Sequence, residues 1–333
     1  MHYRRGEAKQ AVREQVHGIW AAMTVPFDEM GDLDLPALRK DTRYLIDVLQ
    51  VDGLFCAGVM AEFWALSSEE RRAVVEAVVD EADGHCRVIA HTGHHSAREA
   101  IELTRHAESA GADFAVLINP YYPRVGEAGL YAWFEQVASS VDIGLWLFDT
   151  SYAGYGLSVR LIDSLADIEN ICGIKVGHDH GKFLEILGRA GDRILASEPN
   201  EARWLENLVD HHVQVFMSSA APYLYQNARS QPMRDYTLAA LRGDRETAEE
   251  ISSGLEPLRA MSERYLTGPW RQDGTQPIAA IKEWSSLLGL AGGSVRAPLR
   301  ELTSEQAAAL RADLAATGLL ESVPALEPAQ ASR

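Results

Sequence analysis

Lys175 is the residue of this sequence best placed to do covalent chemistry. It lies in an apolar run, ICGIKV at residues 171–176, whose length and β-branched content predict a buried strand. An amine that faces an apolar interior loses the hydration of its charged form, so its pKa falls and a neutral, nucleophilic fraction is present near neutral pH. Such an amine attacks carbonyl compounds and forms an imine. The alternative is a lysine that leaves the sheet and extends into water.

Histidines form a second set of side chains that can do chemistry. His91, His94 and His95 lie at or after one expected strand, and His178 and His180 follow Lys175. A neutral imidazole can act as an acid or base, and it also suits zinc and related ions. The spacing matches no signature such as His-Glu-x-x-His. We therefore expect no metal and no other cofactor, and we keep His91 and His178 as acid–base candidates.

The elements that must position these residues alternate along the chain. Short apolar runs predict eight strands, at residues 19–24, 53–57, 87–91, 113–118, 143–148, 171–176, 193–197 and 213–217. Amphipathic segments between them, such as residues 34–49 and 67–83, predict helices. Eight such units fit an α/β fold of the (β/α)8 TIM-barrel type, although the periodicity also allows an open, doubly wound sheet. Polar residues at the strand ends favour the barrel, in which they would meet at one mouth.

The chain changes character after about residue 234. Residues 244–266, 275–289 and 303–316 predict helices only, and the last stretch is rich in Ala and Pro. No Gly/Ser-rich or Pro-rich linker divides what precedes. We expect an N-terminal arm (residues 1–17), a (β/α)8 catalytic domain (18–234), a C-terminal helical region (235–320) and a flexible tail (321–333).

Composition restricts the partners and the compartment. The 333 residues include 48 acidic and 31 basic ones, and the formal charge of −17 disfavours nucleic acid and anionic membranes. Three cysteines match neither a disulfide framework nor a Cys-x-x-Cys metal site. The N-terminus lacks an apolar signal core, and no window approaches the roughly 20 apolar residues of a membrane span. We expect a cytoplasmic protein that binds a small molecule and has no nucleic-acid or membrane partner.

Several short motifs follow one another in order from about residue 18 to 316. They are TVPF (24–27), GVMAE (58–62), LSSEER (66–71), GAD (111–113), NPYY (119–122), GIK (173–175) and VRAPL (295–299). In order and spacing the chain resembles the dihydrodipicolinate synthase and N-acetylneuraminate lyase family of (β/α)8 enzymes. The resemblance implies a class I lyase in which Lys175 forms a Schiff base with an α-keto acid, usually pyruvate.

The resemblance also identifies departures around the lysine. Where the family carries two hydroxyl residues that hold the keto-acid carboxylate and relay protons, this chain has Val59 and Met60. Phe148 before Asp149 replaces the usual tyrosine before asparagine, and the family's carboxylate-binding arginine falls near Ala153. Val, Met and Phe neither hydrogen-bond a carboxylate nor transfer protons. We therefore expect aldol cleavage or condensation, hydratase–aldolase or dehydratase chemistry on an unusual substrate, such as an apolar or aryl-substituted keto acid.

Other side chains are candidates to replace the missing groups. Tyr152 and Tyr155 follow Phe148 closely, and either phenol is a candidate proton donor. The resemblance implies that one ring of Tyr121 and Tyr122 is lent across a subunit interface, with Tyr122 as the catalytic candidate, in a homotetramer built as a dimer of dimers. The expected substrate-binding residues are Val59, Met60, Phe148, Asp149, Tyr121, His91, His178, Glu198 and Ser218.

Two further interpretations remain open at this point. The barrel is either an enzyme without an imine, in which histidines or a metal do other chemistry, or a catalytically retired protein that binds a keto acid or sugar acid. No appended DNA-binding or signalling segment accompanies the barrel, which counts against the second of these.

Overall fold

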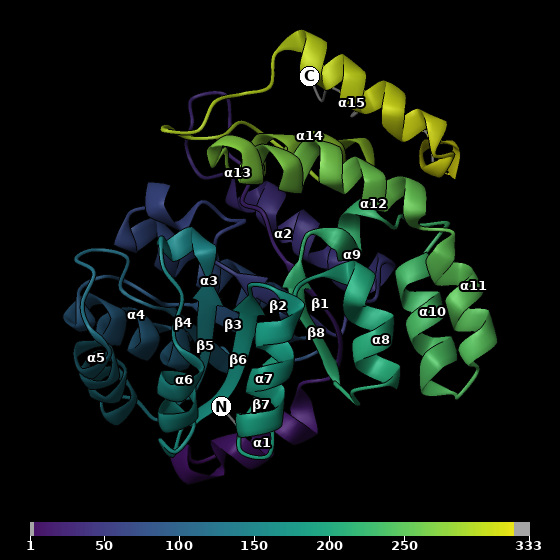
Figure 1. Cartoon of the computed structure of the whole chain (residues 1–333). Helices are drawn as coiled ribbons and strands as arrows, with labels where there is room; N and C mark the ends of the chain where they lie inside the picture. Colours follow the sequence, from purple (N-terminus) through teal and green to yellow (C-terminus); the bar gives the residue numbers. More distant parts are fainter. Residues whose placement is uncertain (1–2, 323–333) are drawn as a thin grey trace. The chain divides into compact units, whose positions relative to one another are not determined.

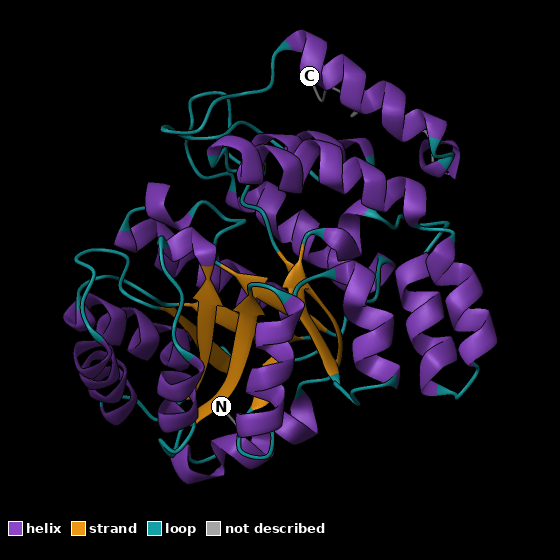
Figure 2. Ribbon diagram, viewed as in Figure 1, coloured by secondary structure: helices purple, strands orange, loops and turns teal. Residues whose placement is uncertain are grey.

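The structure, a computed structural model, describes residues 3–322. Within this range eight parallel strands form one sheet that curls into a nearly closed barrel (Figures 1 and 2), which confirms the predicted (β/α)8 fold. The strands are β1 (Gly18–Ala22), β2 (Gly53–Cys56), β3 (Arg87–His91), β4 (Phe114–Ile118), β5 (Gly144–Thr150), β6 (Ile171–Gly177), β7 (Leu195–Ser197) and β8 (Val215–Ser219). Their order is β7-β6-β5-β4-β3-β2-β1-β8.

A side chain closes the seam between β7 and β8, the neighbouring pair of described strands that lacks a ladder. The hydroxyl of Ser197 lies within 3.0 Å of the carbonyl oxygen of Val215 and 3.1 Å of that of Met217, and it accepts a hydrogen bond from the Met217 amide at 2.6 Å. Ser197 is fully buried. One serine thus supplies polar contacts that a short β7 cannot supply from its backbone.

Strands β5, β6 and β7 differ in length from the expectation. β5 continues to Thr150 and β6 to Gly177, because Asp149 pairs with Val176 and Thr150 with Gly177 in the ladder. This extension places Asp149 within a strand rather than in the following loop. β7 is shorter than expected and begins only at Leu195.

Helices follow the strands along the chain. They are α2 (Leu35–Arg43), which continues into a π-helical turn (Tyr44–Val48), α3 (Ser68–Ala82), α4 (Ala97–Ala110), α5 (Glu127–Ser139), α6 (Val159–Leu165), α7 (His180–Ala190) and α8 (Trp204–Val209). Ser67 caps α3, since its hydroxyl accepts from the Glu70 amide while the Glu70 carboxylate accepts from the Ser67 amide. Helices α3 to α8 lie outside the sheet (Figure 2).

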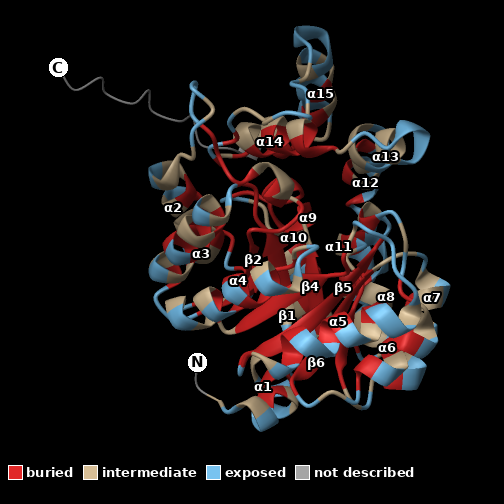
Figure 3. Cartoon of the chain, turned by 90° about the vertical axis from the view of Figure 1, so that its left-hand side faces the viewer, coloured by how far each residue is buried: buried red, intermediate tan, exposed pale blue. Residues whose placement is uncertain are grey.

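The N-terminal segment packs against the barrel. Helix α1 (Ala8–Gln15) contributes Ala8, Ala11 and Val12 to the cluster of buried apolar side chains that fills the barrel. The ring of Tyr3 stacks on Phe114 with centroids 5.3 Å apart. The N-terminal segment therefore contributes to the core of the barrel. Figure 3 shows the strands as the most continuously buried part of the chain.

The chain from Ala221 onward is helical. Its helices are α9 (Ala221–Leu224), α10 (Pro232–Leu241), α11 (Arg245–Ser253), α12 (Glu256–Ser262), α13 (Gly268–Asp273), α14 (Ile278–Leu287) and α15 (Ser304–Ala316), which bears out the expected helical extension. No helix of the described chain has the length and apolar character that a membrane crossing requires.

Two compact units divide the chain. One runs to Val25 and continues over Gln50–Ala220, and the other joins Pro26–Leu49 to the chain from Ala221. Within the second unit, Asp41 accepts a hydrogen bond from the Ala291 amide at 2.9 Å, and the Tyr44 hydroxyl donates to Leu288 at 3.0 Å. These units end at other positions than residues 17, 234 and 320. The domain boundaries that the sequence predicts at those three residues stay a prediction. Residues 323–333 of the expected tail lie outside the described range.

Candidate active site

Lys175 lies near the carboxyl end of β6, opposite Phe148 of β5 and Ser197 of β7. Its Nζ is 4.6 Å from the centroid of the Phe148 ring and 4.9 Å from that of Phe55 in β2. Only 5% of the residue is exposed. The side chain therefore points into the apolar interior of the barrel rather than toward water.

Burial lowers the pKa of Lys175 to about 7, against about 10.5 for an ordinary lysine. The two aromatic faces attract the ammonium form and act in the opposite direction, but each such contact contributes only about 0.5 to 2 kcal/mol. A large part of the amine is therefore neutral at physiological pH. This is the state in which an amine adds to a carbonyl carbon.

The two rings beside the lysine are part of a larger apolar cluster. Phe55, Val59, Phe63 and Phe148 belong to one buried cluster that fills the barrel. Partly buried side chains packed against that cluster are Met60, Trp64, Tyr121 and Tyr152. Val59 and Met60, which the resemblance places at the family's hydroxyl positions, thus belong to or pack against the apolar core of the barrel.

His91 ends β3 and is almost completely buried. Its ring lies 4.5 Å from that of Phe63 and 6.3 Å from that of Phe55, measured between centroids. The Arg71 guanidinium donates to the His91 carbonyl at 2.9 Å and lies 3.3 Å from the ring nitrogen Nδ1. Burial, and after it the charge of Arg71, lowers the pKa of His91 well below its ordinary value. The ring is therefore uncharged at neutral pH, and its lowered pKa makes it a weak base.

Asp149 lies in β5 and is fully buried. Its carboxylate contacts groups from the loop after β5, from the residue after β6 and from α7. One carboxylate oxygen accepts from the Leu157 amide at 2.8 Å and lies 3.1 Å from Nε2 of His178, while the other accepts from the Lys182 ammonium. Burial by itself would raise the pKa of Asp149, but the hydrogen bonds from His178 and Lys182 outweigh it and hold the pKa below its ordinary value. The sequence predicts that Asp149 and His178 contact the substrate. Such a contact would have to replace the hydrogen bond between these two side chains.

The two candidate proton donors of the β5–α6 connection differ in their surroundings. The Tyr155 hydroxyl donates a short hydrogen bond to the carbonyl of Pro120, and Arg124 stacks over its ring at 5.3 Å. Tyr152 packs against the cluster that contains Phe148. Burial raises the pKa of Tyr152, so its phenol keeps its proton at neutral pH. Tyr155 is thus engaged with the neighbouring loop, and Tyr152 is the donor candidate that contacts the core around Lys175.

Tyr121 and Tyr122 lie in different environments although they are adjacent. The Tyr121 hydroxyl lies 3.3 Å from Nδ1 of His95, and its ring is 6.1 Å from that of Phe63. Tyr122 is 75% exposed. Tyr121 thus belongs to the wall of the site, whereas Tyr122 projects into solvent from the isolated chain.

Two buried polar side chains at strand ends have no hydrogen-bond partner among the described residues. The hydroxyl of Ser218, near the end of β8, is one of them. The other is the amide of Asn119, directly after β4, where both the oxygen and the nitrogen are unpartnered. Unpaired buried polar atoms are costly, at about 1 to 3 kcal/mol each. Ser218 was an expected contact residue. Asn119 was not, although its position at a strand end was the available signal.

The remaining residues that were expected at the site do not form one group. Glu198, directly after β7, accepts from His180 at 2.8 Å and from Asn207 at 3.0 Å. The ring of His94 stacks on that of His95, with centroids 4.1 Å apart. His178 lies instead beside Asp149, and His180 lies beside Glu198. The five histidines therefore form no single cluster. Phe55 and Arg71 complete the site and were not expected, because the apolar run of β2 and the helical position of Arg71 gave no chemical signal.

A parallel barrel with a buried lysine of lowered pKa near a strand end defines an α/β-barrel protein with a nucleophilic amine in its interior. Residues 15–317 match the model of the dihydrodipicolinate synthetase family. The chain belongs to this family.

Individual relatives agree with this assignment. A 4-hydroxy-tetrahydrodipicolinate synthase of Methanothrix thermoacetophila is 33% identical over 300 residues, covering 88% of this chain and 94% of that protein. An uncharacterized DapA-like lyase of Halobacterium salinarum is 33% identical over 307 residues, covering 92% of this chain and 95% of that protein. Among solved structures, a prophage protein of the dihydrodipicolinic acid synthase family from E. coli K12, in complex with pyruvate, superposes with a TM-score of 0.80 at 30% identity, over 91% and 99% of the two chains.

Proposed function

We propose that Lys175 forms a Schiff base with an α-keto acid and that the enzyme then cleaves, condenses or dehydrates this substrate. The observation that carries the proposal is the burial of the Lys175 amine against Phe55 and Phe148, which brings its pKa to about 7. The substrate class that the surroundings favour is an apolar or aryl-substituted keto acid. No cofactor takes part in this scheme.

The chemistry follows from the amine and its two rings. The neutral amine adds to the ketone carbon, and loss of water leaves a protonated imine on Lys175. This cation accepts the electron pair of the carbon–carbon bond that breaks, or of the carbon–hydrogen bond that is deprotonated before condensation or dehydration. The faces of Phe55 and Phe148 that lie beside Nζ attract a cation, so they also stabilise the protonated imine.

The groups around the lysine support an apolar substrate. Val59, Met60 and Phe148 present carbon and sulfur where a small, hydrophilic keto acid would need hydroxyl groups. An aryl or alkyl substituent gains about 25 cal/mol for each Å² that such a wall removes from water. The unpartnered hydroxyl of Ser218 and amide nitrogen of Asn119 are our candidates for holding the keto-acid carboxylate.

Proton transfer is assigned to Tyr152 in this proposal. Its phenol keeps its proton because burial raises its pKa, and its ring packs against the cluster that includes Phe148 and Val59. A phenol in that position takes over the role of the hydroxyl groups that the chain lacks. His91, whose ring is uncharged at neutral pH, is the second candidate.

The setting proposed for the enzyme is a cytoplasmic homotetramer without nucleic-acid or membrane partners. The three cysteines are free and buried, as expected in a reducing compartment. The formal charge of −17 supports the absence of anionic polymers as partners.

Reductive trapping tests the Schiff base. The protein is incubated with pyruvate, phenylpyruvate or an alkyl keto acid in the presence of borohydride, and its intact mass and peptide map are measured. We expect one substrate mass per chain on Lys175, greater with the aryl or alkyl acids than with pyruvate. Lys175→Ala should lose both the adduct and turnover, whereas Lys40→Ala, at an exposed position of α2, should retain both.

The outcome also separates the alternatives. Full turnover in Lys175→Ala would refute the imine and favour histidine-based or metal-assisted chemistry. Binding of a keto acid without adduct or turnover in the unmodified protein would favour a retired binding protein.

A further inference from the structure

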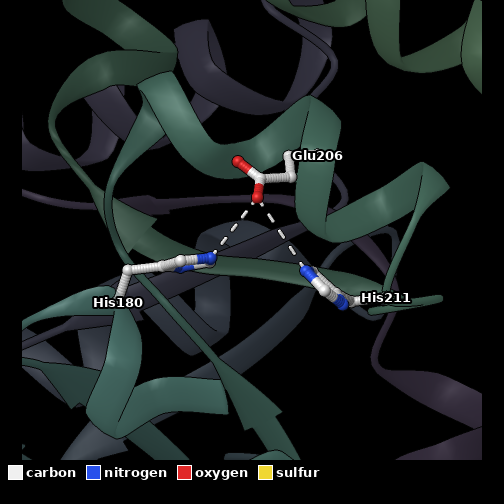
Figure 4. A group of neighbouring side chains, drawn as sticks. All are labelled: His180, Glu206 and His211. Carbon is white, nitrogen blue, oxygen red and sulfur yellow. Dashed lines mark ion pairs between the residues drawn. The ribbon is translucent and has the colours of Figure 1, made fainter.

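Three side chains that were not assigned to the imine site meet near the start of α7 and around α8. They are His180, the first residue of α7, Glu206 of α8, and His211, which follows α8. Within residues 3–322 this is the one group of three His, Cys, Asp or Glu side chains whose potential donor atoms all lie within 4.8 Å of one another. Figure 4 shows both rings directing a nitrogen toward the same oxygen of Glu206.

The tautomer of His180 creates an electrostatic problem that a cation would solve. Its Nδ1 lies 2.8 Å from Oε2 of Glu198, and that oxygen also accepts from the Asn207 amide at 3.0 Å. Since a carboxylate oxygen in this position accepts, Nδ1 carries the hydrogen. Nε2 of a neutral ring then presents its lone pair to Oε1 of Glu206, 3.5 Å away. Two acceptors face each other unless a proton or a metal ion lies between them.

The distances suit a metal ion. Zinc binds histidine nitrogen and carboxylate oxygen at about 2.0 to 2.2 Å, which separates two tetrahedral ligands by about 3.4 Å. Glu206 Oε1 lies 3.5 Å from Nε2 of His180 and 3.9 Å from Nε2 of His211. Small rotations of the side chains would complete the geometry. Nε2 of His180 is itself buried and has no hydrogen-bond partner among the described residues.

The surroundings resemble the outer shell of a metal centre. Glu198 is 3% exposed and holds His180 in the required tautomer, an arrangement that orients metal-binding histidines and raises their basicity. The ring of Phe183 stacks on that of His180 at 5.9 Å. Arg203 occupies the other oxygen of Glu206 at 2.7 Å and so fixes Oε1 toward the histidines.

We propose that His180, Glu206 and His211 bind a divalent transition-metal ion, of which zinc fits the donor set best. Two nitrogens and one oxygen leave a fourth position for water, and the partial exposure of Glu206 and His211 gives the ion access from solvent. The ion ties the start of α7 to α8 and to the segment that leads into β8. Its role is to stabilise the barrel on this side and not to take part in imine chemistry.

Metal binding is measured on the full-length protein. The protein is treated with a chelator, loaded with Zn²⁺, passed through gel filtration, and analysed for bound metal and thermal stability. We expect one zinc ion per chain and a rise in melting temperature of about 3 to 8 °C at zinc concentrations near 100 times Kd. Cobalt(II) in place of zinc should give the visible absorption of a tetrahedral site.

Adjacent histidines provide a matched pair of variants. His211→Asn should lose the zinc and the stabilisation, whereas His212→Asn should retain both, because His212 is exposed, has a φ of 54° that asparagine tolerates, and is absent from the group. Glu206→Gln, which keeps the shape of the side chain, should behave like His211→Asn. The melting temperature of each metal-free variant reports whether it has folded.

Two results would overturn the proposal. One is a parent protein that retains no zinc after gel filtration, which would leave His180 and Glu206 as an imidazolium–carboxylate pair. The other is equal zinc content in folded His211→Asn and His212→Asn, which would place the metal elsewhere.

Discussion

A lysine amine buried against Phe55 and Phe148 exchanges its hydration for the weaker attraction of two aromatic faces. The loss is larger than the gain, so the pKa of Lys175 falls to about 7. In the proposed mechanism the same rings attract the protonated imine. At the scale of single residues, burial lowers the pKa of the amine, and the aromatic faces are placed to stabilise the proposed cationic intermediate.

The pH dependence of imine formation follows from this pKa. Below about pH 7 the Lys175 amine is protonated and cannot add to a ketone, so the rate should fall about tenfold for each further pH unit. Above about pH 7 the rate should level off. Single-turnover trapping of a keto acid, whose own charge is constant over this range, measures the profile. A rate that kept rising to about pH 10 would show an amine with the pKa of a solvated lysine.

The tyrosine variants separate proton transfer from imine capture. Tyr152→Phe should lower turnover about 100-fold or more while the borohydride adduct on Lys175 remains, because only the later step needs the phenol. Tyr155→Phe should have a smaller effect, since its hydroxyl already donates to Pro120. Turnover and trapped mass are measured on the same preparations. Equal, unchanged turnover in both variants would move the role to His91 or to water.

The replacement of the family's hydroxyl residues by apolar ones predicts two reactions that the enzyme does not catalyse. With Val59, Met60 and Phe148 at those positions, condensation of pyruvate with aspartate semialdehyde and cleavage of N-acetylneuraminate should both be negligible. Coupled assays for the two reactions test this. A turnover near the typical enzyme value of about 10 per second on either substrate would contradict it.

At the scale of elements, the order of the strands brings the site together, and the seam between β7 and β8 is the weakest part of that arrangement. Lys175 lies one strand away from the seam, opposite Ser197. The hydroxyl of this serine supplies the polar contacts to Val215 and Met217 across the seam. The positions of β6 and β8 around the site therefore depend in part on one buried side chain.

Ser197→Ala should destabilise the barrel. It leaves buried backbone groups of β8 without a partner, and the expected loss is about 1 to 3 kcal/mol in the free energy of unfolding. Urea unfolding followed by circular dichroism should show a lower midpoint with an unchanged slope. Ser139→Ala is the matched control, because that hydroxyl bonds to Gln136 at an exposed end of α5. Equal midpoints for the two variants would mean that Ser197 contributes nothing to the seam.

At the scale of the whole molecule, the exposure of Tyr122 bears on assembly. A tyrosine that is 75% exposed in the isolated chain, beside the partly buried Tyr121, has apolar surface that a second subunit can cover. We expect a homotetramer built from two dimers, with the dimer as the smallest active species. Light scattering should give a mass near four times that of the chain, and a fully active monomer would refute the shared site.

Subunit mixing tests whether Tyr122 acts across that interface. Tyr122→Ala and Lys175→Ala should each be nearly inactive alone. A hybrid dimer of the two variants contains one site with both residues intact, so an equal mixture should regain about one quarter of the parent activity. Failure to recover activity, with hybrids confirmed by mass, would place Tyr122 in its own subunit's site or outside catalysis.

The local sequence is sufficient to predict the strands, the family and the strand position of Lys175. The alternation of apolar runs with amphipathic segments predicts the eight strands, because burial of both faces of a parallel sheet requires continuous apolar residues. The order of the motifs around Lys175 identifies the family. The length and branched side chains of residues 171–176 are sufficient to place the lysine in a buried strand.

Tertiary structure decided what those residues contact. Sequence position does not reveal that Phe55 and Phe148 lie against the Lys175 amine, that Asp149 bonds to His178 and Lys182, or that Ser197 spans the seam.

Glu198 illustrates the physical reason. As a strand-end carboxylate it was expected at the substrate, yet it accepts from His180 and Asn207. Strand periodicity specifies the end of the barrel at which a side chain emerges. Its direction there depends on which buried donors lie within hydrogen-bonding distance, and those donors come from segments far away in the sequence, so only the folded chain determines them.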